Sequence, residues 1–190
     1  MMALVLIIVG FLMALIAGVF LSFSDFIMRG LAQARGTAGP AAMVGINRAV
    51  YQSIFMVLFV GLLAVSVALA LLAFWQVDGV ALFLVLAGSL SYGLGVFAVS
   101  GLGNVPLNNR LDALSGSMEQ TAPYWSDYAR RWTRLNNIRS AASAFAAIAW
   151  LIAANQICCL GITSSVFNPN PPFVALRSNA RFACSMPNGR

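Results

Sequence analysis

The chain has 190 residues, of which 61% are hydrophobic and only 8% are charged, and its mean hydropathy is +0.86. A soluble domain carries about 25% charged residues, so this composition excludes a water-covered surface and indicates one that faces lipid. The net charge of +6 comes from arginine, and the chain contains no His. The absence of His removes the commonest metal ligand and the usual general base near neutral pH. Nucleic-acid binding is not expected, because the sequence shows no basic face with interleaved aromatic residues.

The first two uncharged stretches are each long enough to cross a bilayer, which takes roughly 20 apolar residues. We expect the first span at about residues 3–28 and the second at about 49–76. The first stretch has no basic n-region of the kind that begins a signal peptide, so we expect it to be a retained helix. A Gly-containing loop around Pro40 separates them. Residues 41–50 are expected to lead straight into the second span.

The third stretch begins at a turn signal, Asp78-Gly79, which predicts an antiparallel hairpin between spans two and three. This third span is expected at about 79–103. It is rich in small residues, which allow helices to approach closely in lipid. They are Gly88, Ser89, Ser91, Gly93, Gly95, Ser100, Gly101 and Gly103.

The fourth helix is expected to start near Pro123, before the membrane, and to cross it at about 137–164. The chain therefore predicts an all-α, integral membrane four-helix bundle of up-down-up-down topology over residues 1–166. The tail, 167–190, has neither helical nor strand periodicity and is expected to be irregular or disordered.

Cysteine usage predicts neither a metal site nor a redox pair. Cys158 and Cys159 are adjacent and Cys184 lies in the tail, so no C-x-x-C is present. A bridge from Cys184 to Cys158 or Cys159 is left open for a tail outside the cytoplasm.

The arginines are concentrated in the connection between spans one and two and in the connection between spans three and four. The positive-inside rule then places both connections in the cytoplasm and both termini outside a cell membrane that the chain crosses several times. The residues counted are Arg29, Arg35 and Arg48 in the first connection and Arg110, Arg130, Arg131, Arg134 and Arg139 in the third.

An aromatic and polar stripe precedes and enters the fourth span. Its members recur every three or four residues and so share one helix face. They are Trp125, Tyr128, Trp132, Asn136, Arg139 and Ser143. Two interpretations stand: an anchor at the membrane interface, or donors for an anionic ligand, since an ionisable residue at membrane depth indicates a functional site.

Two further polar groups are expected at the same end of the bundle. Asn104 and Asn108 flank Pro106 at the end of span three, where the proline is expected to break or kink the helix. Asp25 lies at the end of span one, on the same side of the bundle, and we expect it to form a buried ion pair with Arg48 or with Arg139. The choice between these partners stays open.

At these residues the chain resembles the anthrone oxygenase family of small membrane proteins. The likeness covers about residues 3–160. It is carried by S-F-S-D-F-I-M at 22–28, A-A-M-V-G-I-N-R-A-V at 41–50, G-N-V-P-L-N at 103–108 and W-x-x-Y-x-x-x-W-x-x-x-N-x-x-R at 125–139. Relatives often carry His and Pro at two positions where this chain has Asn137 and Arg29.

The resemblance implies an oxidoreductase, a monooxygenase of polyketide chemistry, that converts a phenolic polycyclic ketone to a quinone with molecular oxygen and without a cofactor. Preorganised donors would stabilise the substrate anion, and aromatic side chains would stack on its rings. The expected donors are Arg139, Asn136, Asn104 and Asn108; the expected substrate-binding residues are Trp125, Tyr128, Trp132 and Asp25. Asp25, Tyr128 or bulk solvent would be the base.

An alternative from a different class is a non-catalytic membrane protein that binds a lipid or quinone or scaffolds a partner. In that case the stripe is a structural polar network. The expected partners are an apolar aromatic small molecule or a lipid, together with the surrounding membrane lipids, and a homo-oligomer is left open.

Overall fold

The computed structural model describes residues 1–166, so the predicted tail and Cys184 lie outside the described residues. Within 1–166 the chain forms helices and no strand. Four of these helical stretches are long and apolar enough to cross a membrane, which confirms the expected all-α fold with four spans. They are Met2–Gln33, Ile54–Gln76, Gly79–Leu114 and Glu119–Cys159.

Two of the four long stretches, Met2–Gln33 and Gly79–Leu114, consist of several segments, some of them π-helical (η). The order is α1 (Met2–Ser22), η1 (Phe23–Ile27), α2 (Met28–Gln33), α3 (Ala38–Val50), α4 (Ile54–Gln76), α5 (Gly79–Leu90), η2 (Ser91–Ala98), η3 (Ser100–Asn104), α6 (Val105–Leu114) and α7 (Met118–Val166).

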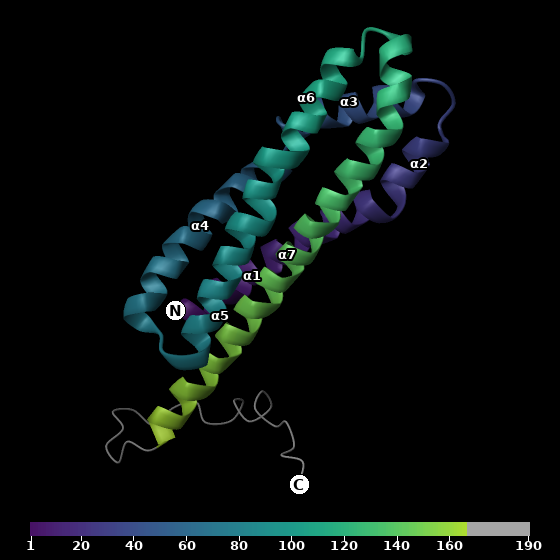
Figure 1. The fold of residues 1–190 in the computed structure, drawn as a ribbon. Helices are drawn as coiled ribbons and strands as arrows, with labels where there is room; N and C mark the ends of the chain where they lie inside the picture. Colours follow the sequence, from purple (N-terminus) through teal and green to yellow (C-terminus); the bar gives the residue numbers. More distant parts are fainter. Residues whose placement is uncertain (167–190) are drawn as a thin grey trace.

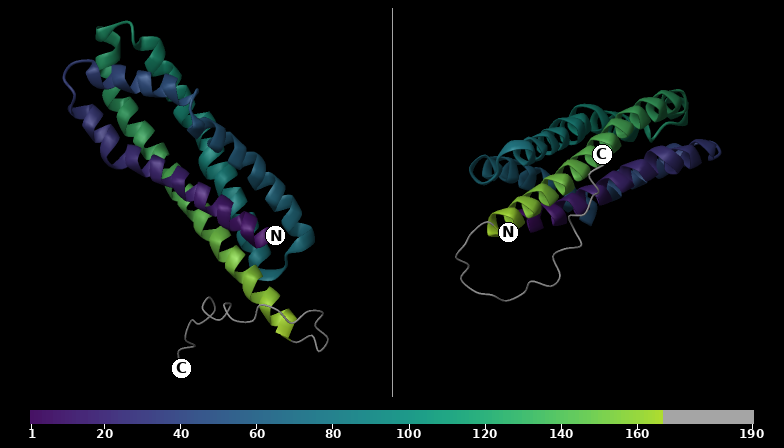
Figure 2. Two further views of the ribbon diagram at one scale, coloured as in Figure 1. Left: turned by 180° about the vertical axis from the view of Figure 1, so that it is seen from behind. Right: turned by 90° about the horizontal axis from the view of Figure 1, so that it is seen from below.

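Helix α7 is the axis of the bundle. It packs along α1 on one side and along α5, η2 and η3 on another, while α4 packs mainly on α5 (Figures 1 and 2). α7 begins at Met118 rather than near Pro123. Pro123 lies inside α7, five residues after its first residue, and the helix continues past it.

The hairpin between α4 and α5 forms where the sequence predicted it. Gly79 has a φ of +61°, a left-handed conformation that glycine adopts without steric cost. Val77 and Asp78 before it are extended, so the chain reverses within two residues.

Two expected boundaries are wrong. Residues 41–50 do not lead straight into the second span: α3 ends at Val50, and a turn through Ser53, whose backbone is extended, precedes α4. α3 instead crosses the end of the bundle (Figure 2, left). The third helix does not break at Pro106: Gly79–Leu114 is one continuous helical stretch, and Pro106 lies just after the π-helical η3 within it.

The small residues of the third helix allow close packing against α7. A Cβ on Gly88 would lie 2.6 Å from the Trp150 ring, and one on Gly95 would lie 2.5 Å from the Ala142 Cβ. Trp150 is fully buried, and its Nε1 donates to the Val85 carbonyl at 3.1 Å. Many large apolar side chains of the spans are exposed, as expected for a surface in lipid.

Candidate functional site

Arg139 is the centre of a polar network inside the bundle. It lies on α7 and is only 8% exposed. Its Nη2 donates to Asn136 Oδ1 at 2.6 Å and its Nη1 donates to Ser100 Oγ at 3.2 Å. Nε is buried and has no hydrogen-bond partner among the described residues. The guanidinium therefore keeps an unpaired N–H donor at Nε.

Aromatic rings cover this guanidinium. Its central carbon lies 4.4 Å from the centre of the Phe20 ring and 5.3 Å from the centre of the Trp132 ring. Ring faces attract a cation and at the same time exclude water from it. The two rings thus cover a charged group that is largely buried in the bundle.

No acidic side chain balances this charge. The chain has five acidic residues, all of them among the described residues, and none forms an ion pair with Arg139. Asp25 pairs with Arg29 on the surface, so the expected buried pair of Asp25 with Arg48 or Arg139 is wrong. Residues four apart on one helix meet readily, which explains the local choice, while Arg48 pairs with Asp112 at 2.6 Å.

Asn136 ties the network to the first helix. This fully buried side chain donates from Nδ2 to the Phe20 carbonyl at 2.5 Å and to Ser24 Oγ at 2.7 Å. Ser24 lies in η1, a type of segment that often occurs at functional sites. The Nδ2 group of Asn136 therefore bonds to the first helix, and its Oδ1 accepts from Arg139 and orients that side chain.

Asn104 joins the network from the third helix. Its Nδ2 donates to the Trp132 carbonyl at 3.3 Å, while its Oδ1 is buried without a partner. Both Asn104 and Ser100 belong to η3, which turns the two side chains toward α7. The unpaired oxygen is a second atom at which the site can bind a ligand.

A small cavity adjoins these groups. Its volume is about 80 Å³, and Arg139, Ser100, Asn104 and Asn108 contribute its polar wall. Ligand pockets usually measure about 300–1,000 Å³, so a three-ring substrate requires the cavity to open. The apolar wall is formed by Val50, Tyr51, Phe55, Met56, Phe59 and Val105.

The aromatic wall was not predicted from the sequence. Phe59 stacks on Phe55 and on Phe97, with ring centres 6.1 and 5.5 Å apart, and Phe20 meets Phe55 edge-on at 5.7 Å. The only local signal was the spacing of Phe55 and Phe59, four residues apart and so on one face of α4.

The expected aromatic site residues lie about two to four turns of α7 before Arg139, outside the cavity wall. Tyr128 is buried and its hydroxyl donates to Asn108 Oδ1 at 2.9 Å. Trp125 stacks on Tyr128 at 5.5 Å. These rings pack with Met28, Met43 and Leu111 beneath α2, α3 and α6. Trp132 connects these rings to the Arg139 site. The predicted stripe is therefore continuous, but most of it packs against other side chains of the protein.

Asn137, where relatives often carry His, is exposed. It is the next residue after Asn136 and so points away from the network, because successive helix residues are about 100° apart. A histidine at this position would not reach the cavity in this arrangement. Cys158, another open question, is exposed and free.

The comparisons with known proteins agree with the resemblance noted above. The chain matches the family model of the anthrone oxygenases over residues 50–149, more than half of its 190 residues. No match was found among curated proteins or among solved structures. The matched range includes Ser100, Asn104, Asn136 and Arg139, and the chain belongs to the anthrone oxygenase family.

Proposed function

We propose that this protein is a cofactor-independent oxygenase that binds the anion of a phenolic polycyclic ketone beside Arg139 and converts it to a quinone. The observation that carries the proposal is the buried guanidinium without a carboxylate partner. Burying an uncompensated charge costs several kcal/mol. An anionic ligand in the cavity would offset this cost.

The reaction balances with an anthrone and oxygen alone: anthrone plus O₂ gives anthraquinone plus water. The central carbon first loses a proton, and the resulting charge is delocalised onto the ketone oxygen. The carbon then bonds to one oxygen atom of O₂. The other oxygen leaves as water together with the two hydrogens that the carbon carried, so no external reductant is needed.

Within this scheme Arg139 binds the ketone oxygen as its negative charge develops. A positive charge already held in place and shielded from water is the kind of group that lowers such a barrier. Ser100 and Asn136 position the guanidinium through the two bonds described above. Asn104 faces the same cavity, and the Phe55 and Phe59 rings provide an apolar surface for the substrate.

The base in this scheme is solvent. Asp25 is exposed and paired with Arg29, and the Tyr128 hydroxyl is bonded to Asn108. We therefore propose that the proton passes to water or hydroxide at the cavity mouth, beside the half-exposed Tyr51. Stabilisation of the anion by Arg139 favours the proton's departure, because a nearby positive charge lowers the pKa of the carbon acid.

Oxygen consumption tests the proposal directly. The purified protein in detergent is given a simple anthrone, and the rate in empty micelles is subtracted. We expect turnover in the native chain and loss of turnover in Arg139→Gln. The matched control is Arg130→Gln, an exposed arginine on the same helix, which should keep native turnover. A folded native chain with no turnover above the micelle rate contradicts the proposal.

The alternative function, a non-catalytic protein in which the network is structural, is favoured by one observation. Asn136 joins α7 to the first helix across 116 residues of sequence. In that case Arg139→Gln should lower the unfolding temperature without any activity to lose. Measuring thermal unfolding beside oxygen uptake separates the two functions.

A further inference from the structure

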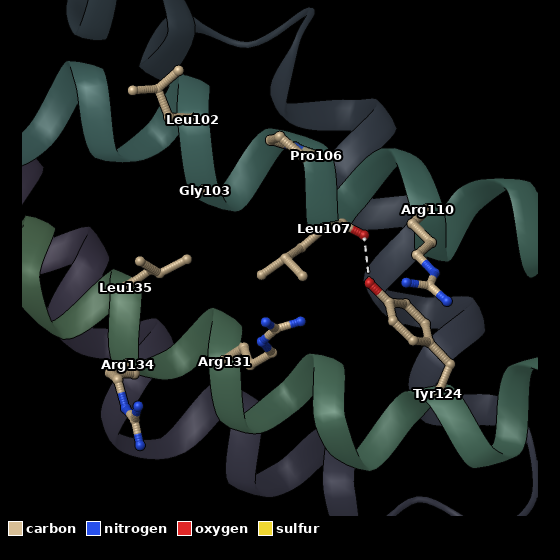
Figure 3. Close-up of a pocket in the computed structure, with 9 residues that line it drawn as sticks. All are labelled: Leu102, Gly103, Pro106, Leu107, Arg110, Tyr124, Arg131, Arg134 and Leu135. Carbon is tan, nitrogen blue, oxygen red and sulfur yellow. Dashed lines mark hydrogen bonds between the residues drawn. The ribbon is translucent and has the colours of Figure 1, made fainter.

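A second pocket, separate from the Arg139 cavity, opens between α6 and α7 (Figure 3). Its volume is about 440 Å³, within the range of ligand pockets. It is formed by Leu102, Gly103, Pro106, Leu107, Arg110, Tyr124, Arg131, Arg134 and Leu135. The Arg139 cavity uses Ser100, Asn104, Val105 and Asn108, so the two sites share the η3–α6 segment but none of its residues.

We call this whole pocket the basic groove. One of its two ends is positively charged. Arg110 lies over the Tyr124 ring, 4.8 Å from its centre, and the Tyr124 hydroxyl donates to the Leu107 carbonyl at 3.5 Å. Arg131 points into the space between the helices (Figure 3). Its Nη1 lies 3.5 Å from Asp127 Oδ2, and Asp127 also pairs with Arg130. Among the described residues, no ion pair includes Arg110. The groove therefore has a net positive charge.

The other end of the basic groove is apolar. Leu102 is 85% exposed and, with Leu135, lies toward the middle of the bundle. Eight residues separate Leu102 from Arg110, which is about 12 Å along a helix. Exposed apolar side chains at one depth and arginines one step nearer the bundle end are the arrangement found at the boundary between acyl chains and headgroups.

We infer that the basic groove binds the headgroup of an anionic phospholipid, with the phosphate between Arg110 and Arg131 and the first acyl carbons over Leu102, Leu107 and Leu135. The charge of the groove complements a phosphodiester, and guanidinium groups suit phosphate oxygens in geometry. The two helices that form this groove belong to stretches long and apolar enough to cross a bilayer, so membrane lipids would lie next to it. This inference is independent of the oxygenase activity.

Native mass spectrometry of the full chain tests it. The protein is released from mixed micelles of phosphatidylglycerol and phosphatidylcholine, and the lipid that remains bound is counted. We expect the native chain to retain phosphatidylglycerol preferentially. Each arginine near an anionic lipid surface contributes about fivefold in affinity, so Arg110→Gln with Arg131→Gln should weaken retention roughly 25-fold. Arg110→Lys with Arg131→Lys should restore most of it.

The matched control is Arg29→Gln with Arg35→Gln, which removes the same charge from exposed positions outside the groove. This control should retain phosphatidylglycerol within about twofold of the native chain. Equal losses in the two double variants would show attraction to net charge alone and overturn the inference. Equal retention of both lipids by the native chain, or displacement of the lipid by millimolar inorganic phosphate, would also overturn it.

Discussion

Replacing Arg139 by methionine should separate binding of the substrate anion from stability of the fold. Methionine has a similar length but no charge. The change removes the bonds to Ser100 and Asn136 and the contacts with Phe20 and Trp132. It also removes a buried charge that no carboxylate compensates. These losses and gains act in opposite directions on the free energy of unfolding.

The magnitudes nearly cancel for stability. Two hydrogen bonds to a charged group contribute about 1.5–3 kcal/mol each, and the two ring contacts add about 1–2 kcal/mol together. The desolvation of the unpaired guanidinium costs several kcal/mol in the opposite direction. We therefore expect the free energy of unfolding to change by less than about 3 kcal/mol.

The effect on an anionic substrate does not cancel. Two unit charges 4 Å apart interact by about 4 kcal/mol at an effective dielectric constant of 20. Losing this interaction in the transition state should lower kcat/KM by about 1,000-fold. The assay pairs oxygen uptake with an anthrone against thermal unfolding in the same detergent. Equal turnover in Arg139→Met and the native chain would refute the reasoning, and unfolding of the variant would indicate a structural role instead.

Three further variants test the packing and the polar network, each by thermal unfolding in detergent. Gly88→Val places carbon against the Trp150 ring and should cost about 1–3 kcal/mol, whereas Gly93→Ala meets no atom within 4 Å and should change stability by less than about 0.5 kcal/mol. Asn136→Leu leaves Ser24 and the Phe20 carbonyl without their donor and should cost about 2–4 kcal/mol; a loss equally large in the exposed control Asn137→Leu would contradict this. Asp112→Asn breaks only an exposed ion pair with Arg48, so a change above about 1 kcal/mol would show that the pair holds α3 in place more strongly than expected.

The π-helical segments explain part of the difference between the predicted and the observed site. η1 and η3 supply Ser24, Ser100 and Asn104 to the network. A π-helix has i→i+5 hydrogen bonds, so side chains no longer follow the 3.6-residue period from which helix faces are predicted. Ser100 was therefore read from the sequence only as a small residue suited to close packing. In the structure it is a partner of Arg139.

Composition and local pattern determined the outline of this protein. The scarcity of charge required a surface in lipid, the lengths of the apolar stretches set four spans, and Asp78-Gly79 placed the hairpin because only a local backbone conformation was needed there. The periodicity of α7 likewise placed Trp132, Asn136 and Arg139 on one face. These features depend on residues close together in the chain.

Tertiary structure decided what that face meets. The positions of the Phe20, Phe55 and Phe59 rings around Arg139 and the bond from Asn136 to the Phe20 carbonyl join different segments. Each helix carries an apolar surface on several sides, because lipid and protein interiors accept the same side chains. Hydropathy consequently does not specify how the helices are rotated against one another, and only their packing shows that Arg139 is buried without an acidic partner.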